Sequence, residues 1–432
     1  MNHIYRIVRN HSTGMLQAVC ETATAQGKSS AGAHGTGICA TTHRQLTPSA
    51  VSAAIAALFG AVFALCMSTP VHAAPTGGQI TAGQGSISQA STANGSGINT
   101  TINQASQKLA INWQQFGSAA GEHIQFNQPG ASAIALNRVV GNEQSQLMGS
   151  LSANGQVFIL NPNGILFGKG AQVNTGGLVA STLNMSDADF MAGNYRFTGS
   201  NTSGKIENHG KLSTNGGIIA LIAPAVENQG NITAHSGQVA LTAGSQVTLT
   251  PQGQLYGITV DAGAVQAQIT NGGIIAAEGG KIHLTAKAWD ALSNALIKHS
   301  GSIEANTTAL NEKGEVILLA DMQHGKTEVS GSITAEGTHA GTDGGFIETS
   351  GAQVNVADSA HISTQANGGK TGTWLIDLED ITIAATGGNI TGAALGAALG
   401  SNSVTIQTGG TGQSGSCTGA TCTGTGSITN GN

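Results

Sequence analysis

Charged side chains, aromatic rings and cysteines are all scarce in this sequence. Only 9% of its 432 residues are charged and 3% are aromatic, whereas about a quarter of an ordinary globular domain is charged. So little charge argues against a solvated helical protein. Disordered chains are usually charged and poor in Ile and Val, yet residues 217–222 and 315–319 form apolar runs. With 64 Gly and many Asn, Thr and Ser, the composition predicts a folded, all-β body.

The first 73 residues have the pattern of an export signal rather than of a fold. Four basic residues precede an apolar run at 51–66, which has about the length of a signal core and is short for a permanent membrane anchor. Val71 and Ala73 supply small residues at positions −3 and −1. We therefore expect cleavage after Ala73 and a product that is not an integral membrane protein.

Removal of this signal changes both the charge and the cysteine content. Residues 1–73 hold four of the 16 basic and one of the 22 acidic residues, so the mature chain has a formal net charge of −9. That charge disfavours nucleic acid or an anionic membrane as partner. Only Cys417 and Cys422 remain, both near the end, where they could close a small disulfide loop. The body itself has no disulfide framework.

Whole motifs recur along the mature chain. Residues 226–232 echo 206–212, and 281–286 echo 238–243. Apolar residues after Gly-centred corners recur about every 20 positions, at Leu212, Ile232, Leu255 and Ile274, and later repeats around Ile303, Ile333 and Ile362 are about 30 apart. Stacked coils would bury the apolar line that a single coil cannot. These repeats predict a parallel β-helix (a β-solenoid), with a β-sandwich as the alternative.

The two ends of the mature chain are less regular. Residues 75–205 contain short candidate strands, and because an open solenoid end exposes an unpaired strand edge, we expect an N-terminal cap there. Residues 384–432 are rich in Gly, Ser and Thr, which indicates either a linker or the first coils of a longer repeat region.

No catalytic or metal-binding set emerges from the residue pattern. Asp377, Glu379 and Asp380 form a carboxylate cluster, but their spacing lacks the Gly of a calcium loop, and a solvated corner or strand end is favoured. The buried core is favoured over a partner surface for Trp113, Phe116 and Trp374. The histidines are scattered, without metal-ligand spacing: His123, His209, His235, His283, His299, His324, His339 and His361. We expect no cofactor, no metal and no enzymatic activity.

Several segments together resemble a known family. Residues 1–11, 13–14 and 25–28 resemble the extended signal-peptide region of large Gram-negative surface proteins. Residues 98–183 resemble the secretion domain of two-partner secretion exoproteins, which include filamentous haemagglutinins and high-molecular-weight adhesins. The carrying segments are residues 111–116, 137–140, 145–149, 155–165 and 174–183. Residues 127–130 depart from the Asn-Pro-Asn-Leu motif of filamentous haemagglutinins, which favours the adhesin type; residues 344–351 and 374–377 also look like that branch.

The resemblance implies a right-handed parallel β-helix. It also implies Sec export, then passage through a dedicated outer-membrane transporter whose periplasmic domains recognise the secretion domain. We assign residues 74–250 to that domain, 251–383 to further adhesin-type coils, and predict a secreted or surface-exposed adhesin with an unidentified host receptor. A toxin-delivery exoprotein and, less favoured, a β-helical polysaccharide enzyme are the alternatives. The candidate residues for transporter recognition are Asn137, Arg138, Gln146 and the corner Asn161, Pro162, Asn163, Gly164 and Ile165. Their polar groups either fix the bend or meet a strand edge of the partner.

Overall fold

The computed structural model describes two separate units of the chain. In the first, the backbone of β1 (Tyr5–Arg9) pairs antiparallel with β2 (Leu16–Cys20). In the second, the described residues are 74–409 without 201–202, 254 and 311, plus the backbone of 415–418, 421–423 and 428–430. The expected cleavage site at Ala73 lies outside these residues. Among the described residues, no helix is both long and apolar enough to cross a membrane.

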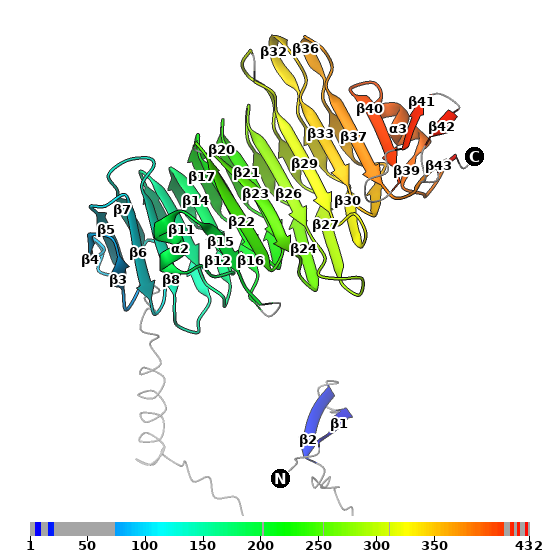
Figure 1. The fold of residues 1–432 in the computed structure, drawn as a ribbon. Coiled ribbons are helices and arrows are strands. Elements are labelled where there is room, and N and C mark those ends of the chain that lie inside the picture. The colour runs from blue at the N-terminus through cyan, green and yellow to red at the C-terminus, as the bar shows by residue number, and fades with distance from the viewer. Residues whose placement is uncertain are drawn as a thin grey trace, which may run out of the picture. The chain divides into compact units, whose positions relative to one another are not determined.

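Three large sheets run along the second unit, one strand of each per coil (Figure 1). The long sheet contains β3 (Gln79–Ala82), β6 (Lys108–Trp113), β8 (Ile134–Val139), β11 (Gln156–Leu160), β14 (Gly177–Ser181), β18 (Ile218–Ala223), β21 (Gln238–Ala243), β26 (Lys281–Ala286), β29 (Glu315–Ala320), β33 (Phe346–Ser350), β37 (Thr373–Leu378), β40 (Ser403–Thr408), β41 (Gly415–Thr418) and β42 (Thr421–Thr423).

The middle sheet contains β4 (Gly85–Ser91), β5 (Ile98–Gln104), β7 (His123–Asn127), β10 (Ser150–Ala153), β13 (Gln172–Thr175), β17 (Lys211–Asn215), β20 (Asn231–His235), β25 (Ile274–Ala276), β28 (Ser302–Glu304), β31 (Ser332–Thr334) and β35 (His361–Ser363). The short sheet contains β9 (Ser145–Leu147), β12 (Ile165–Phe167), β16 (Ile206–Asn208), β19 (Ala225–Asn228), β24 (Gln266–Asn271), β27 (Asn294–His299), β30 (Gly325–Val329) and β34 (Gln353–Val356).

Within these sheets the successive coils pair in parallel, so the expected all-β parallel β-helix is confirmed. The echoed motifs lie directly on one another: Leu212 pairs with Ile232, and Gln238 with Lys281. Inward side chains of all three sheets form one continuous apolar core. Trp113, Phe116 and Trp374 are each 1% exposed within it, which confirms that they are core residues.

Two predicted repeat positions were wrong. Leu255 belongs to β23 (Leu255–Ala262), which leaves the coil as a hairpin with β22 (Gln246–Gln252). Ile232 pairs with Ile275 rather than Ile274, and the Ile274 side chain is 44% exposed. Two adjacent isoleucines fit a strand in either register, so only the pairing decides which one points inward.

A second apolar cluster lies on the outer face of the long sheet. Helix α2 (Asp187–Ala192), β15 (Tyr195–Thr198), β22 and β23 form a layer, here called the outer cover, over that face. Phe158 on β11 packs against Phe190 and Tyr195 of the cover, with ring centroids 6.3 and 5.4 Å apart. Strands β11, β14, β18 and β21 are therefore buried on both faces, which explains why their sequences are mostly apolar and do not alternate.

Regular coils begin earlier than expected, because β5 and β6 already pair in parallel with β7 and β8. The expected N-terminal cap is confined to β3 and β4, which pair antiparallel with β6 and β5 and cover the first edges of two sheets. The irregular part within 75–205 is instead α2 and β15, which leave the coil to join the outer cover.

Beyond residue 384 the chain makes a further coil. After β38 (Ile381–Ala384) and β39 (Ile390–Thr391), helix α3 (Gly392–Ala398) lies against β35, and β40 then joins the long sheet beside β37. Two strands, β32 (Gly337–Thr342) and β36 (Ala366–Gly368), pair in loops outside the coil, and β43 (Ile428–Asn430) pairs with β38. The inserted loops account for the longer repeat in this half.

Glycines form columns at two corners of the coil. Gly217, Gly237 and Gly280 precede successive strands of the long sheet, and a Cβ added at any of them would lie less than 3.0 Å from the carbonyl oxygen of a glycine one coil earlier. Gly230, Gly273, Gly301 and Gly331 repeat this arrangement before the strands of the middle sheet. Much of the glycine content therefore serves close approach of backbone to backbone.

A buried polar column runs along the short sheet. Asn208, Asn228 and Asn271 occupy paired positions, and each donates from its Nδ2 to the next group, over 2.8, 2.7 and 3.1 Å. His299 takes the following position, accepts at Nδ1 from Asn271 and bonds the Ser332 carbonyl oxygen through Nε2 at 3.0 Å. All four side chains are fully buried. This column satisfies polar groups that would otherwise be unpaired in the core.

Candidate functional site

The corner at residues 161–165 is held by its own side chains. Asn161 is fully buried; its Nδ2 donates to the Glu143 carbonyl oxygen and to Ser145 Oγ, both at 2.9 Å. Its Oδ1 accepts from the Asn163 backbone N–H at 3.0 Å, and Asn163 Nδ2 donates to the Gly141 carbonyl oxygen at 3.0 Å. These bonds tie the corner to the preceding coil. They leave Asn163 exposed at the surface.

The predicted recognition residues all fall on two neighbouring coils. Leu160, just before the corner, pairs with Arg138, and Leu166, just after it, pairs with Gln146. Their side chains diverge, however. Asn137 is buried, where its Oδ1 accepts from Trp113 Nε1 at 3.0 Å, and Ile165 and Gly164 are buried as well. Gln146 and Asn163 are the two exposed members.

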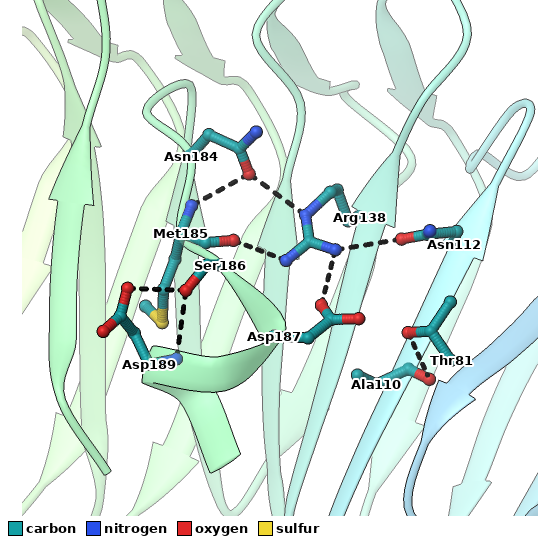
Figure 2. A network of polar contacts seen from close by, with 9 residues as sticks. All are labelled: Thr81, Ala110, Asn112, Arg138, Asn184, Met185, Ser186, Asp187 and Asp189. Atoms are coloured by element: carbon teal, nitrogen blue, oxygen red, sulfur yellow. Dashed lines mark hydrogen bonds and ion pairs between the residues drawn. The ribbon is translucent and has the colours of Figure 1, made fainter. Parts of the chain in front are cut away.

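Arg138 anchors the outer cover to the coil (Figure 2). Its Nη1 lies 2.6 Å from Asp187 Oδ1 at the start of α2 and donates to Asn112 Oδ1 at 3.0 Å. Its Nε donates to Asn184 Oδ1 at 3.1 Å, and its Nη2 donates to the Met185 carbonyl oxygen. The guanidinium thus bonds four groups from two segments, β6 and residues 184–187. This arrangement fixes where the cover lies on the long sheet.

Asp187 stays ionised beside this arginine. Burial of Asp187 works against its charged form, but hydrogen bonds from Thr81 and Arg138, and the charge of Arg138, hold the pKa of the carboxyl below its ordinary value. The helix begins with Ser186, whose Oγ accepts from the Asp189 N–H at 3.0 Å. We did not predict this helix from the sequence, although Ser186 followed by Asp189 is the pattern of a capping box.

An open groove of about 710 Å³ lies where the cover meets the coil. Its lining is polar and carries both signs of charge; it consists of Arg138, Asn184, Met185, Ser186, Asp187, Asp189, Arg196, Thr198 and Gln246. The predicted residue Arg138 therefore lines this groove, but its charge is already compensated by Asp187.

Replacing Arg138 by Met is expected to lower the free energy of unfolding by about 2 kcal/mol, because Asp187 would keep its charge without a cationic partner. Asp187 is 31% exposed, so solvent reduces this cost below that of a fully buried pair. Urea unfolding of the mature chain measures the effect. The control is Arg196→Met on the same groove, where Arg196 is exposed and a change below about 0.5 kcal/mol is expected. Equal losses in both variants would contradict the anchoring role.

The other residues considered in the sequence do not come together in one site. Within the described part of the chain, no three His, Cys, Asp or Glu side chains gather in a way that could hold a metal ion. Asp377 lies on β37 and Glu348 on the adjacent β33; burial raises the pKa of both carboxyls, and the nearby Asp377 adds to the effect on Glu348. Cys417 and Cys422 lie opposite each other in β41 and β42. Their side chains are outside the described residues, so the disulfide remains a prediction.

Comparison with known proteins identifies what this architecture is. Residues 72–335 match the TPS secretion domain, and residues 1–51 match the extended signal peptide of the type V secretion system. Two heme/hemopexin-binding proteins of Haemophilus influenzae are each 32% identical to the chain, over 268 and 243 residues. These matches cover 60% and 51% of this chain but only 28% and 26% of the relatives.

A solved structure shares the fold. The crystal structure of the HMW1 secretion domain from Haemophilus influenzae superposes with a TM-score of 0.63 at 26% sequence identity, over 78% of this chain and 95% of that domain. The extended signal peptide and the secretion domain together mean Sec-dependent export, followed by transport across the outer membrane to the cell surface or beyond. The chain belongs to the two-partner secretion exoproteins, as a member that carries the TPS secretion domain.

Proposed function

We propose that the N-terminal part of the mature chain is recognised by the periplasmic domains of a cognate outer-membrane transporter, and that the exported coils serve as a surface adhesin. The match to the TPS secretion domain over residues 72–335 carries the first half of this proposal. The structural likeness to the secretion domain of HMW1 supports the choice of branch. The relatives that match carry the names of binding proteins, which is in keeping with a non-enzymatic role.

The physical design of the coils suits passage through a pore. A chain must be unfolded while it is threaded, and each coil here pairs only with its two neighbours, so the coils can stack one after another as they emerge. The body between residues 74 and 409 contains no cysteine, so no premature disulfide can lock it in the periplasm. Backbone pairing and the apolar core then hold the emerged coils.

Among the eight candidate residues, we assign recognition to Gln146 and Asn163 and fold maintenance to Asn137 and Asn161. The first two are exposed on neighbouring coils, whereas the hydrogen-bonding groups of the other two are engaged inside the protein. Pro162 and Gly164 shape the bend, and Gly164 has a φ of 116° that other residues rarely adopt.

We expect Asn161→Ala to lower the free energy of unfolding by about 2 kcal/mol, because the Glu143 carbonyl and the Asn163 amide would lose buried partners. Gln146→Ala should leave stability unchanged and reduce release into the medium. Chemical unfolding of the purified chain and the ratio of released to periplasmic protein separate the two effects. Normal release of Gln146→Ala would contradict a role of Gln146 in recognition. Normal stability of Asn161→Ala would contradict the structural role of Asn161.

The adhesive half of the proposal has its own test. Bacteria that produce the chain with its transporter should adhere to epithelial cells, and purified mature chain should compete with that adhesion. The matched control produces the transporter with a chain truncated after residue 335, which keeps the match to the secretion domain. Adhesion that is equal with and without the chain would contradict the adhesin role.

Haem or hemopexin binding is the second candidate function, since the heme/hemopexin-binding proteins are 32% identical to this chain. Titration of the mature chain with haemin, followed by the Soret band, and with hemopexin, followed by calorimetry, tests it directly. Saturable binding at micromolar concentration would favour this function over the adhesin. Failure of both ligands to bind would remove it for the residues present here.

A further inference from the structure

The loop between β26 and β27 exposes two large apolar side chains to solvent. Of the aromatic side chains that the structure describes, Trp289 is the most exposed, at 54%. Leu292, three residues on, is 93% exposed, and Val265 of the preceding coil is 45% exposed. A chain with 3% aromatic residues that leaves a tryptophan beside an exposed leucine has a surface suited to a partner.

Hydrogen bonds fix this loop in place. The backbone N–H of Trp289 donates to the Ala264 carbonyl oxygen at 3.1 Å, and the backbone N–H of Asn294 donates to the Val265 carbonyl oxygen at 3.2 Å. Between these bonds, Asp290 Oδ1 accepts from the Leu292 N–H at 3.0 Å and from Ser293 Oγ at 2.7 Å. The tryptophan and the leucine are thus presented by an ordered turn, which lowers the entropy lost on binding.

The charge around the loop indicates the chemistry of the partner. Hydrogen bonds from Ser293 and Leu292 lower the pKa of the exposed Asp290 carboxyl, so it is ionised at neutral pH. His324 on the following coil lies near this carboxylate. Insertion into lipid would bring the Asp290 carboxylate toward the bilayer, which is unfavourable. An apolar pocket bordered by Lys or Arg on another protein fits both the apolar tip and its charge.

We propose that residues 289–292 form a docking element for the periplasmic domain of the cognate transporter. This inference rests on the proposed transporter recognition, and the loop lies inside the span that matches the secretion domain. The turn around Asp290 is local in sequence, and the bonds to Ala264 and Val265 hold it on the stacked coils. The partner pocket takes the Trp289 indole and the Leu292 side chain, with basic residues facing Asp290.

The test uses the purified mature chain and the purified periplasmic domain of the transporter encoded with it. The double variant Trp289→Ser/Leu292→Ser should bind at least about 30-fold more weakly than the native chain. The matched control is Leu310→Ser, which removes another exposed leucine, at 67%, and should bind normally. Circular dichroism and urea unfolding confirm that both variants fold.

Fluorescence gives an independent readout. Trp113 and Trp374 are each 1% exposed, so a blue shift on complex formation would come from Trp289. Native affinity in the double variant, or a complex without a blue shift, overturns the docking element but leaves transporter recognition intact. Failure of the native chain to bind at all overturns both. A blue shift with phosphatidylethanolamine vesicles and none with the domain would show that the loop meets lipid instead.

Discussion

Gly280→Ala is expected to lower the free energy of unfolding by about 3 kcal/mol, more than any exposed substitution in this chain. The new Cβ would lie less than 3.0 Å from the backbone carbonyl of Gly237 in the preceding coil. Backbone cannot move aside as a flexible side chain does, so the two coils must separate at this corner. That separation weakens the pairing of β26 with β21 and the apolar contacts beneath it.

The matched control is Gly396→Ala in α3. A Cβ at this position meets no atom within 4 Å, and alanine is the better helix former, so stability should stay the same or rise by up to about 1 kcal/mol. Urea unfolding of both variants under identical conditions makes the comparison. If Gly280→Ala were as stable as the native chain, the close stacking of the corners would be wrong.

The second large effect is a loss of stability in mild acid through His299. Burial lowers the pKa of His299 from its ordinary value of 6.5, although hydrogen bonding to the backbone of Ser332 and of Asn271 partly opposes this shift. Between the folded and the unfolded pKa the unfolded chain binds more protons, so lowering the pH favours unfolding. The stability is fully present above about pH 6.5, falls by about 1.4 kcal/mol per pH unit below it, and levels off below the folded pKa.

The strand that carries His299 and the strand paired with it, β27 and β30, offer the imidazolium no opposite charge. Its Nδ1 accepts from Asn271 Nδ2, so a proton on Nδ1 would place two donors face to face. Val329 occupies the paired position on β30, and the Ser332 carbonyl already accepts from the opposite ring nitrogen. Lys298 and Glu328 lie on the same two strands, but their alternation directs them away from the core. No carboxylate on these strands therefore faces the ring.

His299→Asn supplies the control, because asparagine continues the column formed by Asn208, Asn228 and Asn271 and does not titrate. Urea unfolding between pH 4.5 and 7.5 should show a steep loss in the native chain and a much flatter profile in the variant. Asp187 titrates in a separate window: its pKa is lowered, so its contribution is lost only as the pH falls below its ordinary 3.8. Equal acid sensitivity in both proteins would contradict the role of His299.

The sequence was informative wherever a motif repeats as a whole. The echo of residues 206–212 in 226–232 predicts the register that the structure has, because matching motifs bring matching corners and strands together. The role of Asn161 as a turn-forming residue was also open to prediction, since Asn-Pro-Asn-Gly has the chemistry of a fixed bend. The core assignment of Trp113 and Trp374 followed from their size and apolar character.

Features that depend on contacts between distant segments were not predicted. Leu255 fits a coil strand as well as it fits the hairpin that it forms, because both have an alternating pattern. The glycine columns have no local signal, since the close approach arises only when one coil lies on the next. Asp187 could be placed beside Arg138 only once the outer cover was known. His299 could not be singled out from the scattered histidines, because only the strand register shows that it continues the asparagine column.

The most direct measurement of the central claim compares two otherwise identical strains that produce the full chain, one with the cognate outer-membrane transporter and one without it. Mature protein, processed after the signal, is quantified in the medium, on the cell surface and in the periplasm. We predict surface and released protein only in the strain with the transporter, and periplasmic protein in the other. Equal amounts outside both strains would contradict export by two-partner secretion.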